Sequence, residues 1–172
     1  ARNVLLFINV PAWVKAPRVD LQKRLQRKQL ATIPCGDTRI THDLHNQDQD
    51  MILNQMNWLD MHNREHERVK VIFVPCYLDG HDGIFNMHYY DLLIGNDLSI
   101  YPSYYEPWGY TPTESVAFHV PCITTNLTGF GLWVNSLKGT DSKLEDGVKV
   151  VHRTDNNFVD AAEEIKETIL KF

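Results

Sequence analysis

Short apolar runs alternate with segments of helical pattern along almost the whole chain. The runs cover residues 4–10, 69–74, 122–125 and 148–151, and each has the length of a β-strand. Elsewhere apolar residues recur every three or four positions, as they do over residues 159–170. Strands that alternate with helices pack into a mainly parallel sheet with helices on its faces. The sequence therefore predicts an α/β fold, a Rossmann-like three-layer domain. The run 4–10 is apolar nearly throughout, which is typical of a central strand covered on both faces.

The remaining segments divide into helices and loops. Helical spacing predicts further helices over residues 19–30, 47–63 and 87–94. Clusters of Gly, Pro and polar residues predict loops over 32–46, 79–83 and 138–147, and Pro11 and Pro17 bracket another loop. Gly129, Phe130 and Gly131 are predicted to form a flexible turn. The first helix carries a basic cluster that fits a solvated helix face better than a phosphate or glucan site. This cluster comprises Lys23, Arg24, Arg27 and Lys28.

A junction at residues 101–114, with the sequence YPSYYEPWGYTPTE, links a short apolar strand to a helix. Pro102 ends the strand, and Pro107 and Gly109 predict a tight turn. Thr111 suits the helix N-cap, Pro112 suits the first helical position, and Glu114 falls at the third. This spacing predicts a capping box at the start of the helix.

The junction has a structural and a functional interpretation. In the first, Glu114 only caps the helix. In the second, free N–H groups and the positive end of the helix dipole face an anion such as a phosphate, with Glu106 and Glu114 on either side. Glu106 comes too early to cap this helix, and it lies among large rings that are hard to bury together. We therefore favour a ligand site, with these rings lining a cleft: Tyr104, Tyr105, Trp108 and Tyr110.

Composition narrows the class of protein. A chain of 172 residues is long enough for one core, so we expect a single domain over residues 1–172. The net charge of −5 gives no basic surface for nucleic acid and does not suit an anionic membrane. No apolar run approaches the length of a bilayer span. Three widely spaced cysteines support neither a disulfide framework nor a zinc pattern, and they fit a reduced cytoplasm: Cys35, Cys76 and Cys122.

Two sequence patterns hint at a metal, but each has a stronger alternative. Asp48 and Asp50 resemble an Asp-x-Asp metal motif, yet both fall where negative charge complements the dipole of the predicted 47–63 helix. His62 and His66 have the spacing of a metal pair without the rest of a helical zinc motif. We expect no metal and no cofactor.

Residues 101–131, YPSYYEPWGYTPTESVAFHVPCITTNLTGFG, resemble the donor-sugar region of glycogen synthases of the animal and fungal type. Thr41-His42 and residues 4–12, 50–55 and 68–73 resemble further blocks of that family. The resemblance implies the C-terminal half of a retaining glycosyltransferase with the two-domain GT-B fold. It also implies transfer of glucose from a nucleotide diphosphate glucose, most simply UDP-glucose, to the 4-hydroxyl of an α-1,4-glucan.

The same resemblance assigns roles to residues. Glu106 would be the catalytic residue facing the sugar, and Glu114 would hold the ribose hydroxyls. The backbone of Gly109 to Thr111, together with the Thr111 hydroxyl, would meet the phosphates. Trp108 and Tyr110 would wall the pocket, and Tyr89 would stack on the base. His119 stands where the family usually has Gly. If that position needs a left-handed conformation, His carries a cost there.

The resemblance further implies that the chain is a fragment. We expect it to lack the first strand and helix of its domain and the N-terminal acceptor domain, and to be inactive alone. The family's helical insertion for oligomer assembly is almost absent near residues 32–46, which leaves a homo-oligomer open. Two alternatives to the glycogen synthase prediction are a non-catalytic sugar- or nucleotide-binding module and a retaining GT-B transferase that uses another donor, such as ADP-glucose.

Overall fold

The computed structural model of the chain describes residues 3–26 and 35–172. It contains two compact units, Ala1–Tyr89 and Tyr90–Phe172, which we call unit 1 and unit 2 and describe separately. The expectation of one nucleotide-sugar-binding domain over residues 1–172 stays a prediction. The predicted positions of Arg27, Lys28 and Leu30 in the first helix lie outside the described residues.

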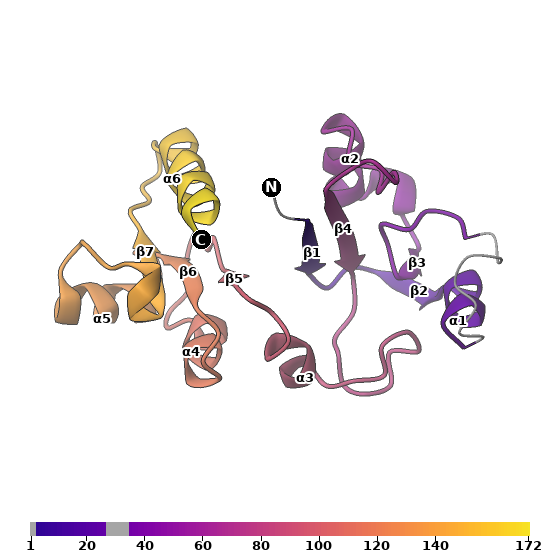
Figure 1. Cartoon of the computed structure of the whole chain (residues 1–172), viewed down its shortest axis with the longest axis horizontal. Helices are drawn as coiled ribbons and strands as arrows, with labels where there is room; N and C mark the ends of the chain where they lie inside the picture. The colour runs from indigo at the N-terminus through magenta and orange to yellow at the C-terminus, as the bar shows by residue number, and fades with distance from the viewer. Residues whose placement is uncertain (1–2, 27–34) are drawn as a thin grey trace. The chain divides into compact units, whose positions relative to one another are not determined.

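Unit 1 is built on two small sheets (Figure 1). Strand β1 (Val4–Asn9) pairs in parallel with β4 (Val69–Val74), and β2 (Val14–Pro17) pairs antiparallel with β3 (His42–Leu44). The helices are α1 (Val19–Gln26), the 3₁₀ helix η1 (Gln47–Gln49) and α2 (Met51–Trp58). The apolar runs predicted β1 and β4, whereas β2 and β3 fall in segments predicted to be loops.

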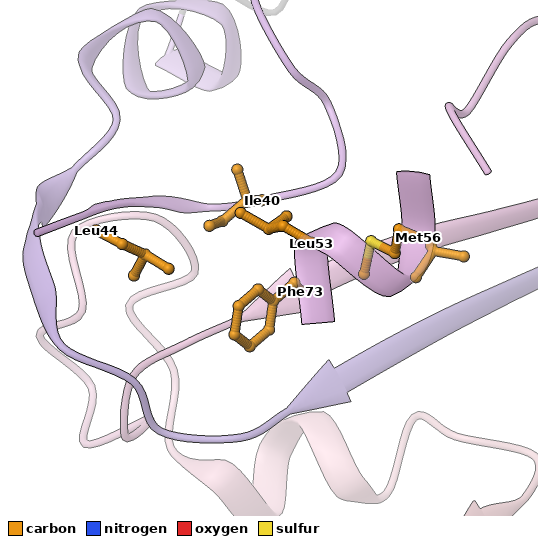
Figure 2. Close-up of a cluster of buried hydrophobic side chains, with 6 residues drawn as sticks. Ile40, Leu44, Leu53, Met56 and Phe73 are labelled. Carbon is orange, nitrogen blue, oxygen red and sulfur yellow. The ribbon is translucent and has the colours of Figure 1, made fainter. Parts of the chain in front are cut away.

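The core of unit 1 forms where α2 packs against β4 and the segment around β3. Figure 2 shows Leu53 and Met56 of α2 next to Phe73 of β4 and Ile40. Phe73 is completely buried and Ile40 is 1% exposed. Because the apolar residues of α2 recur at helical spacing, they share one face of the helix and meet these strands.

Strand β1 does not occupy the central position that its apolar sequence predicts. Among the described residues only β4 pairs with it, and Val4, Leu5 and Leu6 are 47%, 54% and 37% exposed. The prediction of a strand is confirmed, and the prediction that both of its faces are covered is wrong here. A two-stranded parallel sheet leaves β1 with one open edge and too few neighbours to bury it.

Helix α2 is shorter than the predicted 47–63 helix. Asp50 is its N-cap, and the Asp50 carboxylate accepts a hydrogen bond of 2.9 Å from the N–H of Leu53. Residues 47–49 form a separate 3₁₀ turn, so Asp48 lies outside the α-helix. The capping role of Asp50 favours the dipole interpretation for that residue, whereas Asp48 does not lie in the first turn of α2 as predicted.

Unit 2 is a parallel three-stranded sheet with the order β5-β6-β7 (Figure 1). Its strands are β5 (Ser99–Ile100), β6 (Cys122–Thr125) and β7 (Val148–Val151). Helix α3 (Tyr89–Leu93) precedes β5, α4 (Tyr110–Ala117) follows it, and α5 (Gly129–Lys138) follows β6. The 3₁₀ helix η2 (Leu144–Asp146) leads into β7, and α6 (Phe158–Lys171) ends the chain.

Alternate residues of β6 and β7 pack on opposite faces of this sheet. Cys122, Val148 and Val150 contact Phe130 and Val134 of α5. Ile123 and Val151 contact Ala161 and Ile165 of α6 on the other face. Helices therefore cover both faces of a parallel sheet, which confirms the predicted Rossmann-like three-layer α/β arrangement.

Helix α5 was not predicted. The first turn of α5 is formed by Gly129, Phe130 and Gly131, which were expected to form a flexible turn. Thr128 is the N-cap, and its hydroxyl accepts a hydrogen bond of 2.9 Å from the N–H of Gly131. Two glycines near a helix start reduce the helical signal of the sequence, and the Thr128 cap offsets part of that loss. None of the helices among residues 3–26 and 35–172 combines the length and apolar character needed to cross a bilayer.

Candidate functional site

The loop after β5, residues 101–109, lies at the carboxyl edge of the unit 2 sheet. Residues at the ends of β6 and β7 hold it in place. The Thr125 hydroxyl donates a hydrogen bond of 2.7 Å to the Ser103 carbonyl, and Arg153 Nη1 donates one of 2.7 Å to the Pro102 carbonyl. Ligands of open parallel sheets bind beyond this edge. The predicted junction therefore occupies the expected place for a ligand site.

Backbone hydrogen bonds fasten the second half of this loop to the start of α5. The Glu106 N–H donates a hydrogen bond of 3.2 Å to the Leu127 carbonyl, and the Phe130 N–H donates one of 2.7 Å to the Trp108 carbonyl. A Cβ on Gly129 would overlap the Pro107 carbonyl oxygen, so only glycine allows the two backbones to approach this closely. The conformation of the Glu106 loop therefore depends on the segment around Gly129.

Helix α4 begins two residues earlier than predicted. Its N-cap is Gly109, in the left-handed region with φ 98° and ψ 77°, and no side chain caps it. The capping box with Thr111 as N-cap and Glu114 at the third position is therefore wrong. The helix begins at Gly109, before Thr111, because glycine adopts positive φ without steric cost.

The start of α4 presents a row of backbone donors. In the described part of the chain, the N–H groups of Gly109, Tyr110 and Thr111 have no acceptor, and Pro112 has no N–H. These donors point out of the positive end of the helix dipole. The arrangement can bind a phosphate or another anion without a metal.

Glu106 lies next to this helix start. A Cβ on Gly109 would lie 3.1 Å from Glu106 Oε2, and the Ser103 hydroxyl donates a hydrogen bond of 3.4 Å to the same oxygen. The residue is half-buried. Glu106 and the three free N–H groups therefore come together, as the functional interpretation of the junction requires.

Glu114 has a partner that the sequence did not suggest. Its Oε1 accepts a hydrogen bond of 2.8 Å from the Tyr90 hydroxyl, whose ring stacks at 5.1 Å on Phe118. This hydrogen bond raises the pKa of Tyr90. Tyr90 therefore fixes the orientation of the Glu114 carboxylate from α3.

The aromatic residues of the junction are exposed, and the expectation that they line a cleft stays a prediction. Tyr105 and Tyr110 are 75% and 74% exposed, and Trp108 is 38% exposed. Trp108 packs edge-on against the buried ring of Phe130, with 6.2 Å between ring centroids, and lies 6.3 Å from the ring of Trp133. Trp108 thus has a fixed inner edge and a solvent-facing outer one.

Sequence reasoning missed Arg153. Its guanidinium lies over the Tyr104 ring at 5.2 Å and the Phe158 ring at 5.6 Å, and the Tyr104 hydroxyl donates to Asp155. This hydrogen bond raises the pKa of Tyr104. The polar residues directly after β7 were the available signal, because the carboxyl ends of neighbouring parallel strands meet at one edge.

Six of the seven predicted site residues lie in unit 2. The seventh, Tyr89, is the first residue of α3 and the last residue of unit 1, and it is half-buried. A hollow of about 640 Å³ in unit 2 lies between η2, β7 and α6, and none of the predicted site residues lines it. The backbone donors and carboxylates of the junction lie instead at the carboxyl edge of the unit 2 sheet.

Groups able to hold a metal are rare in the described residues. Among these residues, one group of three His, Cys, Asp or Glu side chains has its ligand atoms within 4.8 Å of one another: His42, Cys76 and Asp82, in unit 1. His62 pairs instead with Asp60 at 3.2 Å.

Comparison with known proteins identifies the family. The family model described as glycogen synthase matches residues 13–172. The glycogen [starch] synthase of Neurospora crassa is 34% identical over 155 residues, which are 90% of this chain and 21% of the relative. Isoform 1 from Saccharomyces cerevisiae is 37% identical over 155 residues, 88% of this chain and 22% of the relative. The liver enzyme of Mus musculus is 40% identical over 94 residues, 55% of this chain and 13% of the relative.

The chain thus spans about a fifth of the length of the first two relatives. The family match covers the whole of unit 2, including the junction and the start of α4. On this evidence the chain belongs to the glycogen synthase family.

Proposed function

We propose that this chain is the donor-binding part of a longer glycosyltransferase. The complete enzyme transfers glucose from UDP-glucose to the 4-hydroxyl at the end of an α-1,4-glucan, with retention of configuration. The observation that carries this proposal is the start of α4, where three free N–H groups lie beside the Glu106 carboxylate.

The N–H groups of Gly109, Tyr110 and Thr111 bind the diphosphate of the donor. Negative charge grows on the diphosphate as the glycosidic bond breaks, and preorganised donors stabilise that charge without reorganising. The left-handed Gly109 is what aims the first of these donors outward, since it begins the helix at an angle that other residues rarely adopt.

Glu106 faces the sugar at the reacting carbon. Positive charge develops on the sugar ring in glycosyl transfer, and a nearby carboxylate lowers the energy of that state. Glu114 binds the ribose hydroxyls: the Tyr90 hydroxyl occupies Oε1, and Oε2 has no protein donor among the described residues. Trp108 and Tyr110 wall the pocket, and Tyr89 stacks on the base.

The test is Glu106→Gln in the complete enzyme. The variant keeps the size of the side chain and removes its charge, so we expect donor binding to persist and glucan elongation to fall by at least about 100-fold. Glu145→Gln, at an exposed position of η2, is the matched control and keeps full activity. Undiminished elongation by Glu106→Gln would contradict the catalytic role.

The same assay separates the alternatives. Comparing elongation from UDP-glucose and ADP-glucose identifies the donor. A complete protein that binds a nucleotide sugar tightly, yet neither elongates a glucan nor hydrolyses the donor, would instead be a binding module.

A further inference from the structure

Arg153 lies two residues after β7 and reaches the loop that carries Glu106. Strands β5, β6 and β7 lie side by side in unit 2 (Figure 1), so their ends share the carboxyl edge. The Arg153 N–H donates a hydrogen bond to Asn126 Oδ1, and Asn126 Nδ2 donates one of 3.2 Å to the Arg153 carbonyl. The start of the Arg153 side chain is therefore fixed to the segment that follows β6.

The stretch of loop that Arg153 reaches has little backbone support of its own. The Tyr101 N–H donates a hydrogen bond of 2.8 Å to the Ile123 carbonyl, and the next such bond is that from Glu106 to Leu127. Residues 102–105 form no backbone-to-backbone hydrogen bond with any described residue. Side chains must therefore set the path of the chain immediately before Glu106.

Arg153 holds this stretch at two points. Its Nη1 donates the hydrogen bond of 2.7 Å to the Pro102 carbonyl, and its guanidinium carbon lies 5.2 Å from the centroid of the Tyr104 ring. The Phe158 ring is 5.6 Å from the same carbon. Arg153 Nε is buried without an acceptor among the described residues, so ring faces hold this part of the guanidinium.

Ser103 links these contacts to the carboxylate of Glu106. It lies between Pro102 and Tyr104, the two residues that Arg153 contacts, and its hydroxyl donates the hydrogen bond of 3.4 Å to Glu106 Oε2. The other end of the loop is fixed separately, through the hydrogen bond from Phe130 to the Trp108 carbonyl. Loss of the Arg153 contacts would therefore move Glu106 while the start of α4 stays in place.

Arginine is the side chain that can make both contacts at once. A guanidinium is flat, so its face stacks on an aromatic ring while an N–H at its edge donates to a carbonyl. The ammonium of lysine is a compact point charge that keeps the charge but has no flat face. Arg153→Lys therefore separates the geometry of the guanidinium from its charge.

We propose that Arg153 is a positioning residue for glucose transfer, which fixes residues 102–105 so that Glu106 faces the reacting carbon. This inference rests on the proposed function of Glu106. Arg153 acts through the loop and needs no contact with the substrate. A misplacement of about 1 Å in a reacting group can cost about 100-fold in rate, so a small movement of this loop is enough to slow transfer.

Hydrogen exchange of the 172-residue chain tests whether Arg153 fixes the loop. We expect Arg153→Lys to accelerate exchange of the Glu106 amide by at least about tenfold. The Tyr101 amide, bonded to β6, should keep its rate. Arg64→Lys is the matched control, because Arg64 is an exposed arginine of unit 1 paired with Asp60, and it should leave both rates unchanged.

Kinetics of the complete enzyme test whether this position matters for transfer. Arg153→Lys should lower kcat for glucan elongation by at least about tenfold and leave the KM for UDP-glucose within about twofold. Arg64→Lys should change neither. Arg153→Met, which keeps an unbranched side chain against the rings without the charge, gives a second test if the lysine variant fails to fold.

The competing interpretation is that Arg153 only stabilises unit 2. That role would accelerate exchange at Tyr101 as much as at Glu106 and leave the kcat of the folded enzyme unchanged, and either result would overturn the inference. An unaltered complete enzyme that elongates no glucan would instead refute the proposed function. The exchange rates of the chain would then still decide whether Arg153 fixes the loop.

Discussion

His119 ends α4 in a conformation that favours glycine. It follows the C-cap Phe118 and has φ 62°, in the left-handed region. An L-residue with a Cβ pays about 1 kcal/mol in this region, and glycine does not. The sequence resemblance anticipated this position, because the family usually has Gly there.

We therefore expect His119→Gly to raise the free energy of unfolding by about 0.5–1 kcal/mol. Urea denaturation followed by circular dichroism measures the change. Ala117→Gly, two residues earlier in the last turn of α4, should have the opposite sign because its backbone is helical. A destabilised His119→Gly variant would show that the imidazole makes a contact worth more than the strain.

Asp20 gives the folded chain a dependence on acid pH. Burial opposes its ionised form, but hydrogen bonds from the Gly36 N–H, from Arg18 and from the Leu21 N–H outweigh burial and lower the pKa of Asp20 to about 2. A carboxyl whose folded pKa lies below its ordinary value of 3.8 stabilises the fold above that value. This contribution is lost as the pH falls from about 4 to about 2.

Asp20→Asn should remove that part of the acid sensitivity. We expect the unfolding free energy of the variant to be lower than that of the unaltered chain at pH 6, with the difference shrinking between about pH 4 and pH 2. Urea denaturation over this range measures it. Asp43→Asn, at an exposed position of β3 in the same unit, is the matched control and should not reproduce this change. A difference that stays constant down to pH 2 would refute the role of Asp20.

At the scale of elements, the packing of the Glu106 loop on α5 rests on a glycine. A Cβ on Gly129 would overlap the Pro107 carbonyl and approach the Trp108 backbone and ring at 3.1 Å. Both backbones are fixed by the hydrogen bond from the Gly129 N–H to the Glu106 carbonyl, 3.3 Å, and by that from Phe130 to Trp108. Relief of the overlap must therefore move the loop.

We expect Gly129→Ala to destabilise unit 2 by at least about 2 kcal/mol, as overpacking against fixed atoms does. Hydrogen exchange of the amides of residues 101–109 should accelerate. Gly95→Ala is the matched control, because a Cβ there would meet only ordinary contacts, the nearest at 3.4 Å. Equal effects of the two substitutions would argue against a special role for Gly129.

The sequence predicted those elements whose signal is local. Strands β4, β6 and β7 and helix α6 follow directly from apolar runs or helical spacing. Helix α5 did not, because its first turn contains the two glycines that close approach to Pro107 and Thr125 demands. Strand β2 was missed because it is short and ends at Pro17. Contacts between residues distant in sequence determine where α5 and β2 form, and such contacts leave no pattern in the local sequence.

The candidate site shows the same division. The aromatic junction with Glu106 was visible in the sequence, since strand, turn and helix signals converge there. The N-cap was misplaced by two residues because Gly109 was taken as part of the turn. The hydrogen bond from Tyr90 to Glu114 and the placement of Arg153 over Tyr104 join residues 24 and 49 positions apart in sequence, and pairs this distant leave no local pattern.

For the whole molecule, the proposal separates binding from transfer. The donor groups assigned in unit 2 lie within this chain, whereas the chain spans only 21% and 22% of two full-length relatives. On the proposed function, part of the binding surface lies outside this chain, so we expect the 172-residue chain alone to bind UDP-glucose at least about tenfold more weakly than the complete enzyme.

The chain alone should not elongate a glucan, because catalysis requires donor and acceptor to be held together in a reactive geometry. Calorimetric titration with UDP-glucose measures the first expectation, and incorporation of labelled glucose into glycogen measures the second. Gly109→Ala should abolish the residual binding, because a methyl group at φ 98° next to Glu106 disturbs the start of α4 where the phosphates bind. Elongation by the chain alone would contradict the proposal that this chain binds the donor and only the complete enzyme transfers glucose. Binding that survives in Gly109→Ala would place the donor elsewhere.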